Sequence, residues 1–106
     1  MSPLLLLKRH YLQQVRAGTK TATIRPWKTT TLKPGDRLVF SGGVRAIITR
    51  VVRCTIDTVS AADCQADGFA SSRAFRRAMR DIYPQLADDA PCVVLHFRLA
   101  PLPRRT

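Results

Sequence analysis

The sequence contains no glutamate, and its seven acidic residues are all aspartate. Against them stand 18 lysines and arginines, most of them arginine, which leaves a formal net charge of +11. Such an excess repels itself in the folded state, and a polyanionic partner relieves that repulsion. Arginine suits phosphate because its planar guanidinium donates two parallel hydrogen bonds. The composition favours nucleic acid or a nucleotide as partner; a solubility charge or a coding bias towards arginine is the alternative.

Clustered cysteines and long apolar runs are also missing. The three cysteines are odd in number, widely spaced and form no Cys-x-x-Cys pair: Cys54, Cys64 and Cys92. Only His10 and His96 could join them, so we expect no metal site and no cofactor. Reduced thiols are typical of the cytoplasm, where we expect the protein. The run Leu4 to Leu7 is too short for a signal core, and no segment predicts a membrane span or a membrane-bound amphipathic helix.

The pattern of apolar residues predicts a single α+β domain over residues 1–100, followed by a loose, Pro- and Arg-rich tail over 101–106. Strands are expected over 4–7, 21–25, 38–40, 44–59 and 93–99, and helices over 8–17, 61–67 and 73–83. A slip in the alternation at Val51-Val52 indicates a bulge or two separate strands. Strands outnumber helices and connections are short, which favours a small, nearly closed β-barrel of mostly antiparallel strands with about three short helices.

The segment 18–25, Gly-Thr-Lys-Thr-Ala-Thr-Ile-Arg, gathers cations and hydroxyls where a helix ends and a strand begins. A threonine hydroxyl becomes a nucleophile when a base takes its proton, and a lysine is such a base only when neutral. Burial or nearby positive charge such as Arg25 favours neutral Lys20. In a regular strand, however, Lys20 and Thr23 point to opposite faces. The alternative is that the threonines are ordinary strand residues beside a solvated lysine.

The helix expected over 73–83 carries an arginine stripe. Helical spacing places four arginines on one face, Arg73, Arg76, Arg77 and Arg80, and four apolar residues on the other, Phe75, Ala78, Met79 and Ile82. Like charges three and four residues apart destabilise a helix by roughly 0.2–0.5 kcal/mol per pair, which indicates a compensating anion. We therefore expect the stripe to follow RNA phosphates, with a solvated polar face as the alternative.

Three further positions are candidates. Asp63 and Asp67 lie one helical turn apart and could present a carboxylate towards Lys20, or serve only the helix start and solvent. Trp27 could stack on a base, worth roughly 1–3 kcal/mol, or close one end of the barrel. We expect Lys28, the next residue, to bind RNA as well.

Several blocks together resemble the ASCH domain, a family of the PUA-like superfamily of small RNA-associated β-barrels. Residues 18–25 resemble its Gly-x-Lys-Thr-x-Thr-x-Arg block, and residues 33–36 its Lys-x-Gly-Asp turn. Residues 67–75, with Asp67-Gly68-Phe69, resemble its Glu-Gly-Phe segment, and residues 93–97 its closing strand. The resemblance covers residues 4 to 99, and its specificity comes from the order and spacing of the blocks.

The resemblance implies a PUA-like barrel whose cleft is lined by the Lys-Thr-x-Thr-x-Arg block. Some small ASCH proteins are amidohydrolases of N4-acetylcytidine with a Lys, a Thr and a Glu as catalytic set, whereas others are thought to be RNA-binding modules. By motif, Lys20 becomes the base, Thr23 the nucleophile and Arg25 a clamp for an anion or carbonyl. The position of the Glu falls on Asp67, which is one methylene shorter. We expect a monomer that binds RNA or a modified nucleoside.

Overall fold

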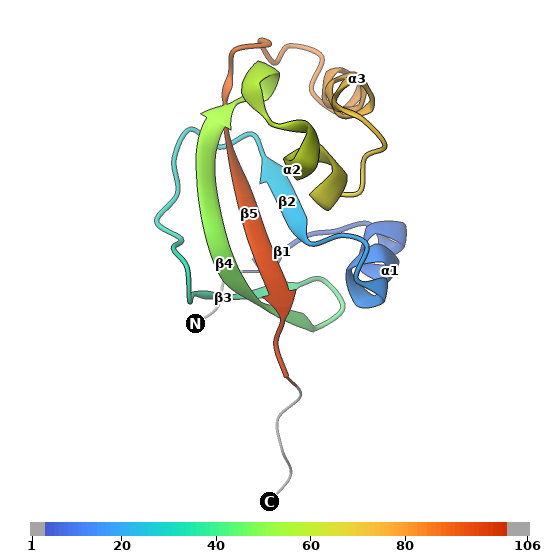
Figure 1. Cartoon of the computed structure of the whole chain (residues 1–106), viewed down its shortest axis with the longest axis vertical. Coiled ribbons are helices and arrows are strands. Elements are labelled where there is room, and N and C mark those ends of the chain that lie inside the picture. The colour runs from blue at the N-terminus through green and yellow to red at the C-terminus, as the bar shows by residue number, and fades with distance from the viewer. Residues whose placement is uncertain (1–3, 102–106) are drawn as a thin grey trace, which may run out of the picture.

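A computed structural model describes residues 4–101 of the chain, and Figure 1 shows its arrangement. The strands are β1 (Leu4–Leu5), β2 (Ala22–Arg25), β3 (Arg37–Phe40), β4 (Val44–Thr55) and β5 (Pro91–Leu99). The helices are α1 (Arg9–Ala17), α2 (Ala61–Ala66) and α3 (Ser72–Ile82), with a 3-10 turn, η1, at Ile56–Thr58. The α+β class is confirmed. Across the described residues, no helix has both the length and the apolar character needed to cross a bilayer.

The strands form one open sheet in the order β1-β3-β4-β5-β2, so the expectation of a nearly closed barrel is wrong. Strand β1 pairs with β3 in parallel, and all other neighbours are antiparallel. The edge strands β1 and β2 have only two and four residues, too few to pair with each other and close the sheet. One side chain bridges their ends instead: Arg25 Nη2 donates to the carbonyl of Leu6 at 3.2 Å.

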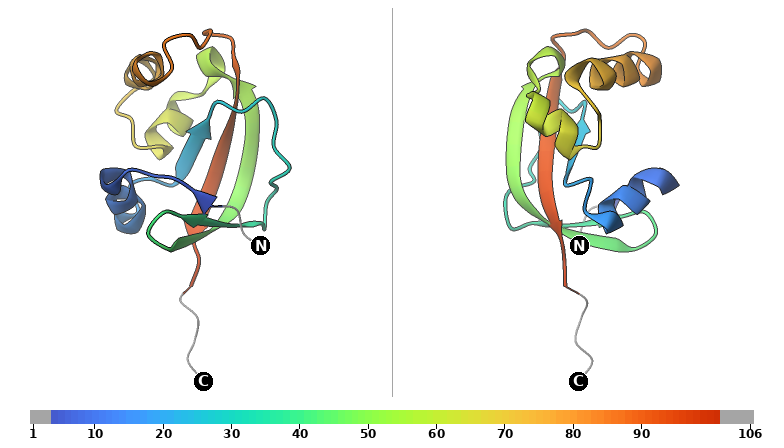
Figure 2. Two further views of the ribbon diagram at one scale, coloured as in Figure 1. Left: turned by 180° about the vertical axis from the view of Figure 1, so that it is seen from behind. Right: turned by 45° about the vertical axis from the view of Figure 1, so that its right-hand side comes forward.

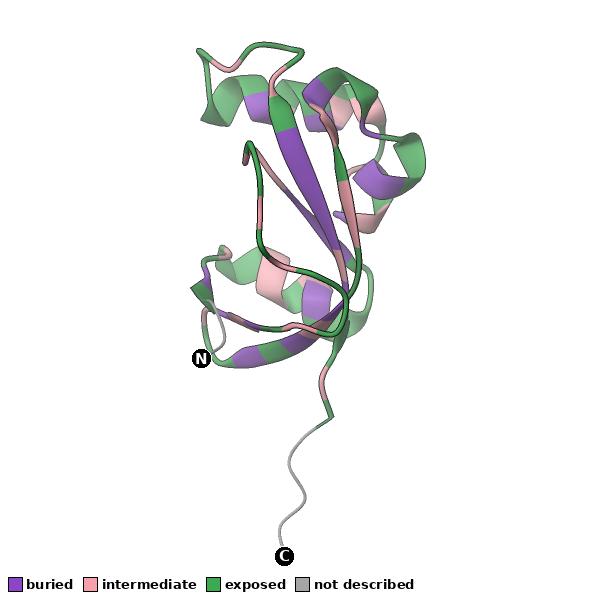
Figure 3. Cartoon of the chain, turned by 90° about the vertical axis from the view of Figure 1, so that its left-hand side faces the viewer, coloured by how far each residue is buried: buried purple, intermediate pink, exposed green. Residues whose placement is uncertain are grey.

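Strand β5 is buried on both faces, as the run of buried residues along it shows in Figure 3. Val93, Leu95 and Phe97 belong to a core cluster that also contains Val15 of α1. Cys92 and Val94 on the other face pack in a second cluster with residues of α2 and α3. The strand predicted over 93–99 is confirmed, but Leu99 is exposed because it lies at the end of the strand.

Two expected strands differ in detail. Strand β4 is one strand of 12 residues, and its irregularity lies between Ile48 and Arg50 rather than at Val51-Val52. Of the run from Leu4 to Leu7, only Leu5 is buried, because β1 is a two-residue strand at the sheet edge.

Helix ends follow the expected capping chemistry. Gly18 ends α1 with φ +82°, a conformation that only glycine adopts at little cost. Ser60 accepts a hydrogen bond from the backbone of Asp63 and caps α2. Helix α3 is capped by Ser71, whose side chain accepts from the backbone N–H of Ala74. Of the tail predicted over 101–106, residues 102–106 lie outside the described residues. Figure 2 shows α1 near one end of the long strands and α2 and α3 near the other.

Candidate functional site

A cavity of about 210 Å³ lies between the segment after β1, helix α1, strand β2 and helix α3. We call it the cleft. Its lining includes all four residues expected from sequence to act together: Lys20, Thr23, Arg25 and Asp67. Three of these side chains are buried, with Lys20 only 2% exposed, so they form a polar floor beneath a mostly apolar wall. The structure therefore brings the predicted set into one concave site.

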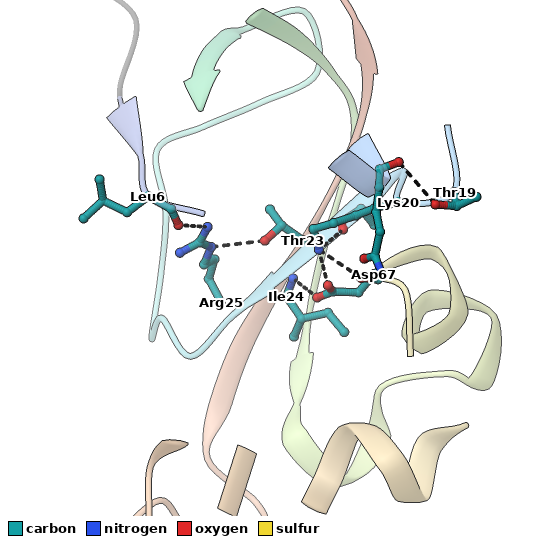
Figure 4. Close-up of polar contacts among 9 residues, drawn as sticks. Leu6, Thr19, Lys20, Thr23, Ile24, Arg25 and Asp67 are labelled. Atoms are coloured by element: carbon teal, nitrogen blue, oxygen red, sulfur yellow. Dashed lines mark hydrogen bonds and ion pairs between the residues drawn. The ribbon is translucent and has the colours of Figure 1, made fainter. Parts of the chain in front are cut away.

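Lys20 and Asp67 form a buried ion pair on this floor, drawn in Figure 4. The Lys20 ammonium donates to Asp67 Oδ1, to the Asp67 carbonyl at 3.0 Å and to the Ala22 carbonyl at 2.9 Å. Asp67 Oδ2 accepts from the backbone N–H of Ile24 at 2.8 Å. The shorter aspartate thus reaches the lysine. Because Lys20 precedes β2, the alternation of a regular strand does not turn it away from the cleft.

Burial shifts both titrating groups towards their neutral forms. Desolvation lowers the pKa of Lys20 below its ordinary value of 10.5, although the nearby Asp67 raises it. Desolvation raises the pKa of Asp67 above 3.8, and the opposing charge of Lys20 only partly offsets this. A lysine whose ammonium form is disfavoured is chemically suited to accept a proton.

Thr23 and Arg25 are joined to each other rather than to Lys20. The buried Thr23 Oγ1 accepts from Arg25 Nε at 3.2 Å, which leaves the hydroxyl proton available for donation. Within residues 4–101, no hydrogen bond connects Thr23 to Lys20. The predicted nucleophile and base share a floor, and transfer of a proton between them requires a small movement or a bridging water.

The ion pair also has a structural role at the sheet edge. Strand β2 pairs with β5 on one side only, so the outward backbone groups of Ala22 and Ile24 need other partners. The Ala22 carbonyl is bonded by Lys20 and the Ile24 N–H by Asp67. Loss of either side chain therefore leaves an unpaired edge group as well as an unpaired charge.

The arginine stripe lines a second concave surface, of about 530 Å³. We call it the arginine groove, and its lining residues are Arg73, Arg76, Arg77, Arg80, Asp57, Asp81 and Asp88. The four arginines are exposed as expected, while Phe75 and Met79 on the opposite side of α3 line the cleft. Ile82 is 55% exposed rather than buried, because α3 ends there beyond the core. Three carboxylates lie among the arginines, so the chain itself supplies part of the compensating negative charge.

Trp27 and Lys28 line neither cavity. Trp27 is half-buried and packs against the core cluster that contains Val93 and Leu95, so it covers part of that core. Lys28 is exposed.

Several residues of the site were not foreseen from sequence. Tyr11 lines the cleft with its ring centroid 5.6 Å from Lys20 Nζ, and Leu6, Ile82 and Tyr83 line its mouth. The only available signal for Tyr11 was its place on the apolar face of α1, which also predicts a core residue.

Histidine and cysteine form small clusters away from the cleft. His96 Nε2 lies 2.9 Å from Asp63 Oδ1, so Asp63 serves this contact and not Lys20. Cys54 and Cys92 face each other across β4 and β5 with their sulfurs 3.5 Å apart, and burial raises the pKa of Cys92 to about 12. Among the described residues, no three His, Cys or Asp side chains are placed to hold a metal ion.

No protein-family model matches the sequence, and no curated protein is significantly similar to it. Solved structures are similar in fold. The ASCH domain from Lactobacillus crispatus superposes with a TM-score of 0.74 at 17% identity, covering 92% of this chain and 79% of that one. An Enterococcus faecalis protein of family DUF984 gives 0.71 at 19% identity, covering 94% and 81%. The ASCH protein from Zymomonas mobilis gives 0.65 at 13% identity, covering 90% and 65%.

Each of these likenesses covers at least 90% of this chain. They agree with the blocks that resemble the ASCH domain, which span residues 4 to 99. The identities are low, so the agreement concerns the arrangement of the backbone. The chain has the fold of the ASCH domains.

Proposed function

We propose that the cleft binds RNA or a modified nucleoside and hydrolyses an acylated base amide such as that of N4-acetylcytidine. The observation that carries the proposal is the buried Lys20–Asp67 pair facing a cavity that it shares with Thr23 and Arg25. Charged groups are placed in such a site at a cost in stability, and strongly perturbed pKa values are typical of functional groups. The fold of the ASCH domains supports the same assignment.

The geometry suggests a role for each side chain. Lys20 becomes a base when its proton passes to Asp67, with which it is paired. Thr23 Oγ1 then adds to the amide carbonyl, and the neutral Lys20 takes the hydroxyl proton and later delivers it to the departing amine. Arg25 has guanidinium hydrogens beyond its bonds to Thr23 and Leu6, and these can hold the developing oxyanion. A water molecule then cleaves the acyl-threonine ester and releases the acid. Asp67 positions Lys20.

Incubation of the protein with N4-acetylcytidine, followed by chromatography for cytidine, tests this reaction. We expect turnover by the unaltered protein and a loss of about 100-fold or more in Lys20→Met and Thr23→Val, since acid–base and nucleophilic groups contribute at least this much. Lys33→Ala, an exposed lysine outside the cleft, is the matched control and should retain activity. The absence of turnover in the unaltered protein would exclude the catalytic proposal.

The second candidate is a non-catalytic RNA-binding module of a ribonucleoprotein or translation-related complex. Its supporting observation is that the three hydrogens of the Lys20 ammonium find three acceptors, which suits a permanently charged, structural lysine. It predicts RNA binding that weakens steeply with salt and no deacetylation. Filter binding at two salt concentrations, run beside the deacetylation assay, separates the two candidates.

The three free cysteines support the cytoplasm as the proposed compartment.

A further inference from the structure

Exposed apolar side chains gather at the mouth of the cleft. Five large hydrophobic residues are exposed among residues 4–101: Leu4, Leu6, Ile82, Tyr83 and Leu99. Three of them line this one cavity, with Leu6 72%, Ile82 55% and Tyr83 41% exposed. Leu6 follows β1, whereas Ile82 and Tyr83 are at the end of α3, so the apolar mouth is assembled from two distant segments. Exposed apolar surface that converges on a cavity marks a place where a ligand is covered.

The mouth and the floor of the cleft have different chemistry. The floor offers hydrogen-bonding groups from Lys20, Thr23 and Arg25, and the mouth offers aliphatic and aromatic carbon, with Lys8 as an exposed cation. The arginines that suit phosphate lie in the other cavity, on the far side of α3. A ligand that matches the cleft therefore has a polar edge that enters first and an apolar face that packs at the mouth.

The aromatic residues and the volume narrow this description to a ring. Tyr11 on α1 and Tyr83 at the end of α3 belong to the two elements that flank the cavity, and tyrosine faces stack on planar rings. The cavity of about 210 Å³ is smaller than the roughly 300–1,000 Å³ of pockets for drug-sized ligands. A cavity of this size suits one ring-sized group better than a larger ligand.

Resting on the proposed function, we infer that the cleft accepts a single unpaired base, free or within single-stranded RNA, and that Tyr83 determines this specificity by packing on the ring. In a duplex, the polar edge of the base is hydrogen-bonded to its partner and both ring faces are stacked, so neither floor nor mouth can reach it. Leu6 and Ile82 complete the apolar contact and exclude water from the floor.

Calorimetric titration tests the inference with three probes: N4-acetylcytidine, a short single-stranded RNA that contains it, and the same RNA annealed to its complement. We expect the first two to bind and annealing to weaken binding by about tenfold or more. Tyr83→Ala should weaken nucleoside binding by roughly 5- to 150-fold, the range of one base–aromatic stack, while Tyr83→Phe restores it. Leu99→Ala, an equally exposed residue outside the cleft, should change nothing.

The outcomes separate the inference from the function on which it rests. Duplex binding as tight as single-strand binding, or unaltered nucleoside affinity in Tyr83→Ala, would overturn the inference and leave the proposed function standing. Binding of none of the three probes would overturn the proposed function and this inference with it. Because Tyr83 is at the exposed end of α3, an unchanged melting temperature of Tyr83→Ala is expected and excludes misfolding as the cause of lost binding.

Discussion

The cleft and the arginine groove lie on opposite sides of α3 and use charge in opposite ways. In the groove, the charged side chains are numerous and solvent-exposed. Arg80 and Asp88, for example, are 67% and 65% exposed, with Arg80 Nη2 3.6 Å from Asp88 Oδ1. In the cleft, the charged side chains are few, and the central pair is buried: the side chain of Lys20 is 2% exposed and that of Asp67 is 9% exposed. Solvent screens the exposed ion pairs of the groove. The buried pair of the cleft is stronger because solvent is excluded from it. The two regions therefore differ in whether solvent screens their charges, and the proposed chemistry rests on the buried pair.

The largest expected difference between the two regions is in stability. Asp67→Ala leaves the Lys20 ammonium buried without its partner and the Ile24 N–H unpaired, so we expect a loss of about 3–5 kcal/mol. Asp88→Ala removes an exposed carboxylate and should change stability by about 0.5 kcal/mol or less. Urea denaturation of both variants measures the contrast. Equal losses would show that the buried pair is not special.

Glycine substitutions test whether the loop after α2 serves the cleft. Gly68 has φ +101° and Gly35 has φ +92°, so an alanine at either position is strained by roughly 1–3 kcal/mol. Only at Gly68 would the new Cβ meet a neighbour, Gln14 Oε1 at 2.8 Å, next to Asp67. We expect similar melting temperatures but lower nucleoside affinity only in Gly68→Ala. Equal affinities in the two variants would contradict the role of this loop.

The pH dependence of stability gives a third test, in the cleft alone. Because the pKa of Asp67 is raised in the folded state, its carboxyl contributes stability that is fully present below about pH 3.8 and lost as the pH rises through the folded value. Asp67→Asn lacks this titration, so the stability of the unaltered protein relative to it should fall across that window. Denaturation of both proteins over a series of acidic pH values measures the trend, and a rising difference would contradict the raised pKa.

The smallest effects belong to the groove. Arg76→Ala and Arg77→Ala remove exposed side chains and should alter the free energy of unfolding by about 0.5 kcal/mol or less. If the groove contacts RNA phosphates, each variant weakens RNA binding and lowers the salt slope by about one, without changing affinity for a free nucleoside. Arg45→Ala, an exposed arginine outside both cavities, is the control. A loss of nucleoside affinity in the groove variants would show that the cleft and the groove act as one binding site and would contradict their separation.

Local patterns predicted most of the fold. The helices predicted over 8–17, 61–67 and 73–83 and the strand predicted over 93–99 differ from α1, α2, α3 and β5 by only one or two residues at their ends, because the apolar periodicity that marks them acts within a few residues. The open sheet was not predicted, since closure depends on whether β1 and β2 are long enough to pair, a property of the assembled fold.

The site was predicted in part. The block from Lys20 to Arg25 is contiguous in sequence. Asp67 was one of two candidate carboxylates until the resemblance singled it out, and the fold brings it to Lys20 over 47 positions. Leu6 and Tyr83 reach the cleft only through tertiary packing of distant segments, and no local pattern distinguishes them from core or surface residues. The three carboxylates of the groove were invisible for the same reason.

The central claim is that the cleft, and not the arginine groove, receives the nucleoside. The most direct measurement is a titration of the isotope-labelled protein with N4-acetylcytidine, following the backbone amide resonances by NMR. The account predicts the largest shifts within residues 20–25 and 67–69, the two segments that carry the floor residues of the cleft. Shifts confined to the arginine-bearing positions of α3, or no shifts at saturating nucleoside, would contradict it.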